Sequence, residues 1–384
     1  MRVLALVTEA FGGYGGIAQY NRDLLGALSA SDLISEIVVL PRLGDVWQCR
    51  LPDKVEQRAP ISQRSLYSLE ALRLATLKGS FDLIFCGHLY LSPLAHLLAT
   101  SIGAPQWLQL HGIEAWTRPG NLVERALNSA RCITTVSRYT RRKVLSWASI
   151  EHSQVRVLPN CIRQFYLDGS PTDPRKIIDR LGLTGKRLIL TVARIDKGDV
   201  YKGHATVIDV VAELKKIHPD LVYLVVGEGG NRAALEQLVA SHSLQDAVLF
   251  LGRLSDEDVR NLYFASNAFV MPSTGEGFGI VFLEAAACGL PAIGGNRDGT
   301  VDALADGALG TLIDPNDRQQ LFAAILDVVQ GDNRVPKTAD VARFGAHNFN
   351  HHVEALLRSF ACASCNDATS WRPGKDHYSN VMWS

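Results

Sequence analysis

Two glutamates eight residues apart stand out in the segment MPSTGEGFGIVFLEAAACGLP, residues 271–291. Glu276 lies in a glycine-rich turn, and Glu284 lies in the apolar helix predicted to follow it. An uncompensated carboxylate amid apolar residues is costly, so Glu284 is expected to meet a polar ligand. Gly277 and Gly279 leave backbone N–H groups open to an anion or a sugar hydroxyl. The alternative interpretation makes Glu276 a helix-start carboxylate and Glu284 half of a buried ion pair.

Two cations follow a strand pattern in the segment TVARIDKGDVYKGHATV. Arg194 comes directly after the strand, and Lys202 with Gly203 begins the next predicted helix, whose N-terminal dipole adds positive potential. A planar guanidinium and a mobile ammonium that converge form a natural clamp for a diphosphate. Lys197 competes for the same role, but the apolar helical period begins after Lys202. Two solvated surface charges are the alternative.

A glycine-rich loop, FGGYGG at residues 11–16, follows the first strand pattern and precedes a helical one. Its glycines, among them Gly15 and Gly16, permit positive φ angles and a close backbone approach, and a helix start offers free N–H groups to a phosphate. The spacing matches neither the dinucleotide fingerprint nor the P-loop. A plain flexible turn is the alternative.

A histidine, His111, stands at the predicted end of a strand in WLQLHGIEAW, with Glu114 three residues further on. A histidine at this position could donate to a substrate or orient it. A structural core histidine is equally compatible with the position.

The tripeptide Asp256-Glu257-Asp258 resembles the Asp-x-Asp motif that holds a metal in many nucleotide-sugar enzymes. Here it follows Ser255 and opens an apolar-periodic helix, which is the pattern of helix capping. No metal site is therefore predicted.

Short apolar or β-branched runs alternate with amphipathic stretches along the chain, as in parallel sheets covered on both faces. The predicted strands are 3–7, 34–40, 82–86, 106–110, 132–136, 155–158, 187–192, 222–226, 248–251, 268–271 and 291–293. The predicted helices are 16–28, 68–78, 122–129, 204–217, 232–241, 256–265, 282–287 and 318–329.

Eleven strands favour two sheets over one, and the segment 159–185, rich in Pro, Gly and Asp, is the best boundary. The fold class is therefore α/β, with two Rossmann-like, doubly wound parallel-sheet domains that face each other across a cleft. The predicted domains are residues 1–165 and 166–360, followed by an irregular tail at 361–384. Ligands of such sheets bind beyond the carboxyl ends of the strands.

Composition excludes several classes of protein. The chain has 384 residues, of which 47% are hydrophobic and 20% charged, with 39 basic and 39 acidic side chains. This balance excludes disorder and a global cationic field for nucleic acid. Residues 1–165 carry 18 basic and 12 acidic side chains, so the first half could favour an anionic substrate or membrane face. No apolar run is long enough to span a membrane, and no signal peptide is recognised.

Cysteine usage points to a reducing compartment. The seven cysteines are an odd number spread over a long chain, so a disulfide framework is not expected. We therefore expect a cytoplasmic location. The lone Cys362-Ala-Ser-Cys365 has no second pair at finger spacing, which argues against a zinc site.

Taken together, these residues resemble the retaining glycosyltransferases of family 4, which depend on nucleotide sugars and have the GT-B fold. The resemblance covers roughly residues 1–330. It is carried by GGYGG, by Arg194 with Lys202-Gly203, by Val226-Gly-Glu-Gly229, by Leu251-Gly-Arg253 and above all by the Glu276–Glu284 element. The stretch GGNRDGTVDAL at 294–304 replaces the commoner Gly-Gly-Val-Pro-Glu loop.

The resemblance implies a role for each matching residue. Arg194 and Lys202 would bind the donor diphosphate, and Glu284 the ribose hydroxyls. Glu276 would hydrogen-bond the donor sugar, and His111 would lie beside it. The further donor-site positions are Gly15, Gly16, Gly227 and the backbone N–H groups of Phe278, Gly279 and Ile280.

The resemblance also implies the reaction. A hexose, with mannose from GDP-mannose or glucose from UDP-glucose favoured, would pass to a glycan or lipid-linked acceptor with retention. The departing phosphate would deprotonate the acceptor, and no metal or other cofactor would be required. The alternatives are a GT-B nucleotide-sugar epimerase or phosphorylase and a non-catalytic nucleotide-sugar-binding subunit. Basic and leucine residues in 58–79 also suggest peripheral contact with the inner face of a membrane.

Overall fold

The computed structural model describes residues 1–45, 47, 50–77, 81–168, 173–331 and 338–361. The chain divides into two compact units. Unit 1 comprises Met1–Cys161 together with the segment that begins at Phe344, and unit 2 comprises Ile162–Arg343. The Cys362–Cys365 pair and the predicted tail beyond Ala361 lie outside the described residues.

Unit 1 is built on a parallel sheet of seven strands in the order β3-β2-β1-β4-β5-β6-β7. The direction of winding reverses between β1 and β4, which are neighbours in the sheet. The strands are β1 (Arg2–Val7), β2 (Glu36–Pro41), β3 (Val55–Gln57), β4 (Leu83–Cys86), β5 (Gln106–Leu110), β6 (Cys132–Thr135) and β7 (Val155–Val157).

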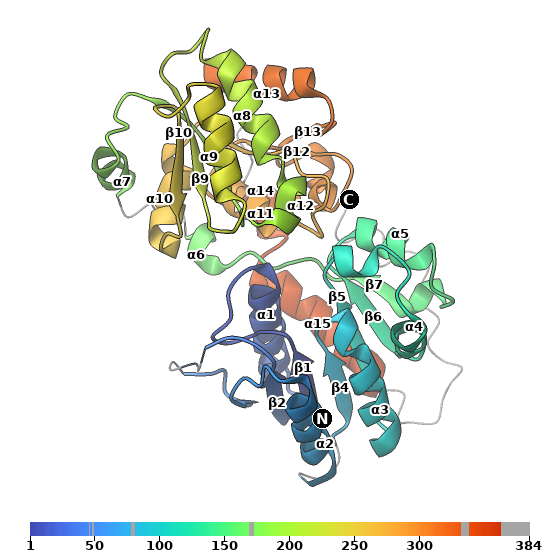
Figure 1. Cartoon of the computed structure of the whole chain (residues 1–384). Helices are drawn as coiled ribbons and strands as arrows, with labels where there is room; N and C mark the ends of the chain where they lie inside the picture. The colour runs from blue at the N-terminus through green and yellow to red at the C-terminus, as the bar shows by residue number, and fades with distance from the viewer. Residues whose placement is uncertain (46, 48–49, 78–80, 169–172, 332–337, 362–384) are drawn as a thin grey trace. The chain divides into compact units, whose positions relative to one another are not determined.

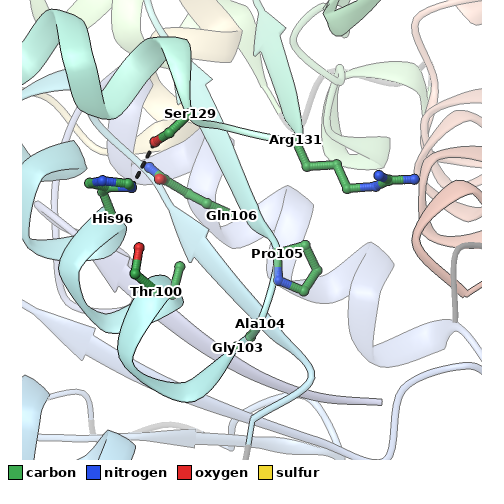
Figure 2. Close-up of a pocket in the computed structure, with 9 residues that line it drawn as sticks. His96, Thr100, Gly103, Ala104, Pro105, Gln106, Ser129 and Arg131 are labelled. Atoms are coloured by element: carbon green, nitrogen blue, oxygen red, sulfur yellow. Dashed lines mark hydrogen bonds between the residues drawn. The ribbon is translucent and has the colours of Figure 1, made fainter.

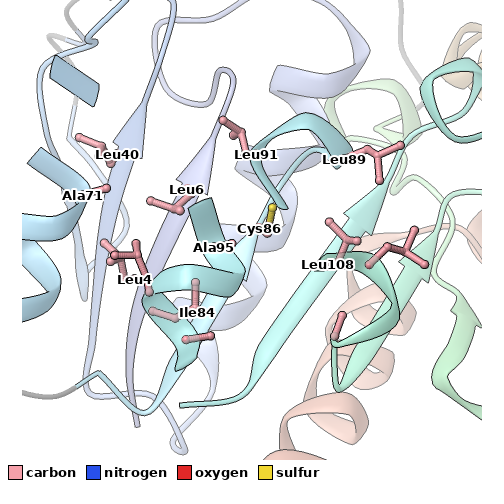
Figure 3. Packing of buried hydrophobic residues seen from close by; sticks show 14 of the residues in the cluster. Leu4, Leu6, Leu40, Ala71, Ile84, Cys86, Leu89, Leu91, Ala95 and Leu108 are labelled. Carbon is pink, nitrogen blue, oxygen red and sulfur yellow. The ribbon is translucent and has the colours of Figure 1, made fainter. Parts of the chain in front are cut away.

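Helices cover both faces of this sheet, so the central strands are buried on both sides (Figure 1). Figure 3 shows one core, in which Leu4, Leu6 and Ile84 of the strands pack with Ala71 and Ala95 of the helices. The helices are α1 (Gly16–Ala30), α2 (Arg64–Leu77), α3 (Ser92–Ile102), α4 (Asn121–Asn128), α5 (Arg138–Leu145) and α15 (Ala346–Ala361), with the short η1 (Leu89–Leu91), η2 (Ile113–Ala115) and η3 (His152–Gln154).

The C-terminal helix α15 corrects the predicted domain boundary. The sequence analysis placed residues up to 360 in the second domain, but α15 belongs to unit 1 and lies beside α1, red against blue in Figure 1. Phe360 stacks on Trp107 of β5, and Ser31 donates a 2.5 Å hydrogen bond to Glu354. The apolar side of α15 thus covers the face of the sheet opposite to the core of Figure 3.

Unit 2 is built on a parallel sheet of six strands in the order β10-β9-β8-β11-β12-β13. Here the winding reverses between β8 and β11. The strands are β8 (Arg187–Val192), β9 (Leu221–Val226), β10 (Val248–Gly252), β11 (Ala268–Met271), β12 (Ala292–Gly295) and β13 (Thr311–Ile313).

One core of unit 2 joins α8, α9 and α13 to a single face of the sheet, through Val207, Leu235 and Ile325 among others. The helices are α6 (Gln164–Leu167), α7 (Pro174–Arg180), α8 (His204–Leu214), α9 (Arg232–Ser241), α10 (Asp256–Ala265), α11 (Ile280–Ala287), α12 (Thr300–Ala303), α13 (Arg318–Gln330) and α14 (Thr338–Ala342), with η4 (Lys197–Lys202) and η5 (Ala305–Gly307).

The predicted α/β class with two parallel sheets is confirmed, and each predicted strand overlaps a strand of the structure. The prediction lacks the three-residue strands β3 and β13 and several helices, of which α3 and α15 are the longest. The helix predicted over 204–217 begins at His204, directly after Lys202 and Gly203, and the helix predicted over 282–287 begins two residues earlier, at Ile280.

Candidate active site

The candidate site of unit 2 lies at the carboxyl ends of three strands that are neighbours in the sheet, β8, β11 and β12. Loop 193–203 follows β8, loop 272–279 follows β11, and loop 296–299 follows β12. The winding of the sheet reverses between β8 and β11, and a reversal of this kind is where open parallel sheets bind their ligands. This edge carries Arg194, Lys202 and Glu276 of the predicted site.

The loop after β8 holds its charged side chains in a chain of contacts. The Arg194 guanidinium, 70% exposed, lies 3.3 Å from Oδ1 of buried Asp199, and the Tyr201 hydroxyl donates to the same oxygen at 3.0 Å. The Lys202 ammonium lies 5.3 Å from the centre of the Tyr201 ring. Arg194 and Lys202 therefore flank one tyrosine, whereas Lys197 lies exposed at the other end of η4.

Lys202 and Glu276 are in direct contact. The Lys202 ammonium donates a hydrogen bond to Oε1 of Glu276, and the two side chains are only 13% and 11% exposed. Burial raises the pKa of Tyr201, and the negative charges of Glu276 and Asp199 add to this effect. Glu276 therefore lies close to the contacting side chains of the loop after β8. Residues 74 positions apart thus form one ion pair at the carboxyl ends of β8 and β11.

Glycines allow the loops of this edge to touch through their backbones. A Cβ on Gly227 would lie 1.9 Å from the carbonyl oxygen of Ala193, and one on Gly203 would lie 2.8 Å from that of Pro272. Gly227 has φ of +140° and Gly203 of +80°, which other residues rarely adopt. The structure therefore gives Gly227 a packing reason that is sufficient without a ligand.

The loop after β11 leads into α11 without a capping side chain. Gly279 is the N-cap residue, with φ of +90°, and no side-chain hydrogen bond closes this end of α11. Phe278 is buried against the unit, and Ile280 is the first residue of the helix. The N–H groups at this helix start are thus positioned to receive an anion or a hydroxyl oxygen.

Asp298, in the loop after β12, is a site residue that the sequence analysis did not identify. Its side chain is buried at 1% exposure and accepts a 2.7 Å hydrogen bond from the backbone N–H of Glu276. Burial raises the pKa of Asp298 to about 6, and the charge of Glu276 adds to this, whereas hydrogen bonds from Glu276 and Thr300 oppose it. The signal was present, because Asp298 lies within the noted GGNRDGTVDAL stretch.

Glu284 belongs to a separate group of side chains. Its Oε2 accepts a 3.0 Å hydrogen bond from the Tyr263 hydroxyl, and its Oε1 lies 3.9 Å from the Arg163 guanidinium. Burial raises the pKa of Glu284, and the positive charge of Arg163 and the Tyr263 bond lower it. This arrangement matches the alternative of a buried ion pair, in a side chain that is 12% exposed.

The Asp-x-Asp tripeptide is occupied in structural contacts, as predicted. The Ser255 hydroxyl caps α10 by accepting from the N–H of Asp258 at 3.1 Å. Arg163 donates to Asp256 at 2.6 Å, and Arg180 donates to Asp258 at 3.1 Å. Within the described ranges, no cluster of three His, Cys, Asp or Glu side chains could hold a metal ion.

His111 lies at the carboxyl end of β5 in unit 1, close to the winding reversal of that sheet. Its Nε2 lies 2.9 Å from the Gly87 carbonyl, which can only accept, so Nε2 carries the proton and Nδ1 the lone pair. Its backbone N–H donates to Glu114 at 2.6 Å. Burial lowers the pKa of His111 to about 4 against the opposing charge of Glu114, so the ring is neutral at pH 7.

The glycine-rich loop after β1 divides into two parts. A Cβ on Gly12 would lie 2.0 Å from the carbonyl oxygen of Asp45, so Gly12 is required by packing. Gly15 and Gly16 face open space, and no side chain caps α1, which starts at Gly16. The φ of +88° at Gly15 is a glycine conformation. These two residues thus leave a helix start accessible to a ligand.

A hollow of about 280 Å³ lies at the opposite edge of the first sheet, where β5 begins (Figure 2). Figure 2 shows His96 bonded to Ser129 at 2.7 Å, with the Gln106 amide directed toward them and the Arg131 side chain directed away. None of the predicted site residues lines this hollow. His111 is at the other end of β5, so the hollow is separate from the candidate site.

No helix in the part of the chain that the structure describes is both long and apolar enough to cross a bilayer. Cys86, Cys132, Cys161 and Cys288 are buried free thiols. Burial raises the pKa of each, for example that of Cys132 to about 11, so these thiols are not poised as nucleophiles.

Two families match the chain. Residues 14–163 match Glycosyltransferase Family 4, and residues 173–343 match Glycosyl transferases group 1. The two matched segments fall within unit 1 and unit 2, respectively, apart from Ile162 and Arg163 at the junction.

Curated relatives cover most of the chain. A GDP-mannose-dependent alpha-(1-6)-phosphatidylinositol monomannoside mannosyltransferase of Mycolicibacterium smegmatis is 28% identical, over 69% of this chain and 72% of the relative. The corresponding monoacylated-substrate enzyme of Corynebacterium glutamicum is 29% identical, over 87% and 89%. O-antigen chain mannosyltransferase B of Escherichia coli is 26% identical, over 83% and 88%.

Solved structures share the fold. The crystal structure of Anabaena HepE in complex with UDP and glucose superposes with a TM-score of 0.78 and 20% sequence identity. The match covers 94% of this chain and all of that one. At this identity the likeness concerns the fold alone.

Proposed function

The chain belongs to the glycosyl transferases group 1 of family 4 and has the GT-B fold, and on that premise we propose that it moves a hexose from a nucleotide-diphosphate sugar to a glycan or lipid-linked acceptor with retention. Mannose from GDP-mannose is the favoured donor, because two of the relatives are named as GDP-mannose-dependent. UDP-glucose is the alternative donor.

The contact between Lys202 and Glu276 carries this proposal. In a nucleotide sugar the second phosphate is bonded directly to the anomeric carbon of the sugar. A site for this linkage therefore needs a cation for the phosphate immediately beside an acceptor for sugar hydroxyls. Lys202 and Glu276 offer these two groups side by side in the loops after β8 and β11.

The leaving diphosphate gains negative charge as its bond to the sugar breaks. Lys202 would stabilise this charge as a nearby ammonium, and Arg194 would add a mobile guanidinium from the same loop. Glu276 would accept hydrogen bonds from the sugar hydroxyls and hold the ring in place. The uncapped start of α11 would complete the anion and hydroxyl contacts through backbone N–H groups.

Glu284 and unit 1 have proposed roles around this centre. The Glu284 carboxylate would accept from the ribose hydroxyls of the donor. Unit 1 would supply the acceptor side, where neutral His111 and the open Gly15–Gly16 loop lie at the winding reversal of its sheet. With protein cations on the diphosphate, the proposal requires no metal ion.

The test is product analysis with purified protein, GDP-mannose or UDP-glucose and a lipid-linked or glycan acceptor, with EDTA present. We expect an α-linked product by NMR from an α-linked donor. An inverted anomer would refute retention, and a donor converted without any acceptor would indicate an epimerase. Loss of transfer on chelation, restored by Mg²⁺ or Mn²⁺, would refute the metal-independent mechanism.

Peripheral membrane contact remains part of the proposal. Leu66, Leu69 and Leu72 of α2 are exposed, which suits insertion between lipid headgroups, although Arg73 is held by two 2.7 Å hydrogen bonds to Glu70. We expect co-sedimentation with anionic liposomes at low salt, reduced by Leu66→Ser with Leu69→Ser. Failure of the unaltered protein to co-sediment would refute this contact.

A further inference from the structure

We infer that Asp298 is a positioning residue for Glu276, because its buried carboxylate fixes the backbone turn that presents Glu276 to the donor sugar. The inference rests on the proposed function, in which Glu276 contacts that sugar. Asp298 itself touches neither the sugar nor the diphosphate in this role. Its effect on the reaction is exerted through the position of another carboxylate.

The contacts of Asp298 converge on the turn after β11. Its Oδ2 accepts from the backbone N–H of Glu276 at 2.7 Å and from the Ser273 hydroxyl at 3.1 Å. Ser273 in turn accepts from the N–H of Gly275 at 3.1 Å. The other carboxylate oxygen of Asp298, Oδ1, accepts from the N–H of Thr300 at 2.9 Å, which fastens the carboxylate to its own loop. One side chain therefore determines the conformation of residues 273–276.

The two loops are also joined directly through their backbones. The N–H of Gly299 donates to the carbonyl of Glu276 at 2.9 Å, so Glu276 is held at both its N–H and its C=O. A Cβ on Gly299 would lie 2.0 Å from the Gly277 carbonyl oxygen, and one on Gly295 would lie 2.1 Å from that of Ser273. With its backbone held at both groups, Glu276 starts from a fixed position, from which its side chain reaches Lys202.

The chemistry of the site explains why a carboxylate is needed. Three donors, two backbone N–H groups and one hydroxyl, meet two oxygen atoms at 1% exposure. An ionised carboxylate can accept all three hydrogen bonds. An amide has one accepting oxygen only, and its NH₂ group would face at least one of these donors. The negative charge of Asp298 lies near that of Glu276, and Lys202 pairs with Glu276.

This arrangement predicts which step suffers when Asp298 is changed. The diphosphate contacts proposed for Lys202 and Arg194 come from the other loop and do not pass through Asp298. The sugar contact of Glu276, by contrast, depends on the turn that Asp298 holds. We therefore expect Asp298→Asn to lower kcat of transfer by about 10- to 100-fold, as for a misplaced catalytic contact, with binding of free GDP changed less than about threefold.

The experiment is a double-mutant cycle in the full chain, with kcat and donor KM for transfer and calorimetric binding of GDP as readouts. The variants are Asp298→Asn, Glu276→Gln and the double variant, with Ser273→Ala as a milder change to the same turn. Asp317→Ala is the matched control, because Asp317 also accepts two backbone N–H groups, at the start of α13, but away from the candidate site.

If Asp298 acts through Glu276, kcat of the double variant should lie within about twofold of kcat of Glu276→Gln. Asp317→Ala should keep the kcat of the unaltered protein. Ser273→Ala should fall between the unaltered protein and Asp298→Asn. Effects of Asp298 and Glu276 that multiply, or an Asp298→Asn variant with unaltered kcat, would overturn the inference while leaving the proposed function intact. An unaltered protein without transfer or donor binding would overturn both.

Discussion

Replacing Lys202 by methionine removes the cation of the ion pair and keeps a side chain of similar length. Glu276 is then left as a nearly buried carboxylate without its partner, since the two side chains are 13% and 11% exposed. Loss of one partner of a buried pair costs about 3–5 kcal/mol, and some water access places this case near about 3 kcal/mol. For a unit of this size that corresponds to a fall in Tm of about 6–12 °C.

The assay is thermal unfolding without ligand for Lys202→Met, Glu276→Gln and the double variant. Neutralising Glu276 in the Lys202→Met background should restore about 2 kcal/mol, because the unpaired charge disappears. Transfer should fall by about 100- to 1,000-fold in kcat/KM for Lys202→Met, the loss expected for one preorganised charge at a leaving group. Lys197→Met, at the exposed start of η4, is the matched control and should keep both properties.

Two results would contradict this reasoning. Additive losses of stability in the double variant would mean that the ion pair contributes nothing in solution. An equal loss of transfer in Lys197→Met and Lys202→Met would mean that general positive charge in the loop, and not the cation beside Glu276, supports the reaction.

Three further predictions follow from the same structure. Gly16→Ala should fold normally, because a Cβ there meets only open space, yet it should lower transfer at least tenfold if a ligand approaches this loop. The control is Gly26→Ala, which also places a Cβ in open space on α1. This control should keep its activity and unfold at an equal or higher temperature. Asp256→Asn should lose the ion pair with Arg163 but change transfer less than about threefold and leave it insensitive to EDTA, since that carboxylate makes a contact with Arg163 outside the proposed donor site. Burial lowers the pKa of His204 to about 4, so as the pH falls the unfolded chain binds a proton on this histidine before the folded chain does. The free energy of unfolding should therefore decrease between pH 6.5 and pH 4, on the order of 3 kcal/mol from this residue. Urea unfolding at pH 7.5 and 5 measures this loss, and an equal pH dependence in His204→Gln would contradict it.

The central strands could be predicted because they are covered on both faces. Residues 3–7 and 222–226 are almost completely buried, and such continuous apolar runs differ clearly from the amphipathic stretches around them. The edge strands β3 and β13 are half-exposed and only three residues long, so no such run exists. Their existence depends on pairing with β2 and β12, which a local pattern does not contain.

The missed helices had different causes. Helix α3 carries its own signals, a proline in its first turn and Gly103 in a left-handed conformation at its end, and attention to these would have identified it. Helix α15 has an apolar face, but its partners α1 and β5 lie more than two hundred residues earlier in the sequence. Its assignment to unit 1 depends on tertiary packing, and chain order alone suggested the opposite.

The candidate site shows the same division between motif and packing. Motifs and residue types named Lys202 and Glu276 separately, and the structure brings the two side chains into contact. The partners of Glu284 could not be named, because Tyr263 and Arg163 come from α10 and from the segment before α6. Asp298 escaped because no spacing rule links it to Glu276.

Strand order supplies the missing link. Parallel strands end at a common edge, so residues that follow neighbouring strands meet there whatever their separation in sequence. In unit 2, Lys202, Glu276 and Asp298 follow β8, β11 and β12, which stand next to one another in the sheet. In unit 1 the same rule brings Gly87, after β4, to His111, after β5, and the two are hydrogen-bonded. Knowledge of the order β8-β11-β12 would therefore have been enough to search the loop after β12 for a partner of Glu276, and Asp298 is the one acidic residue in loop 296–299.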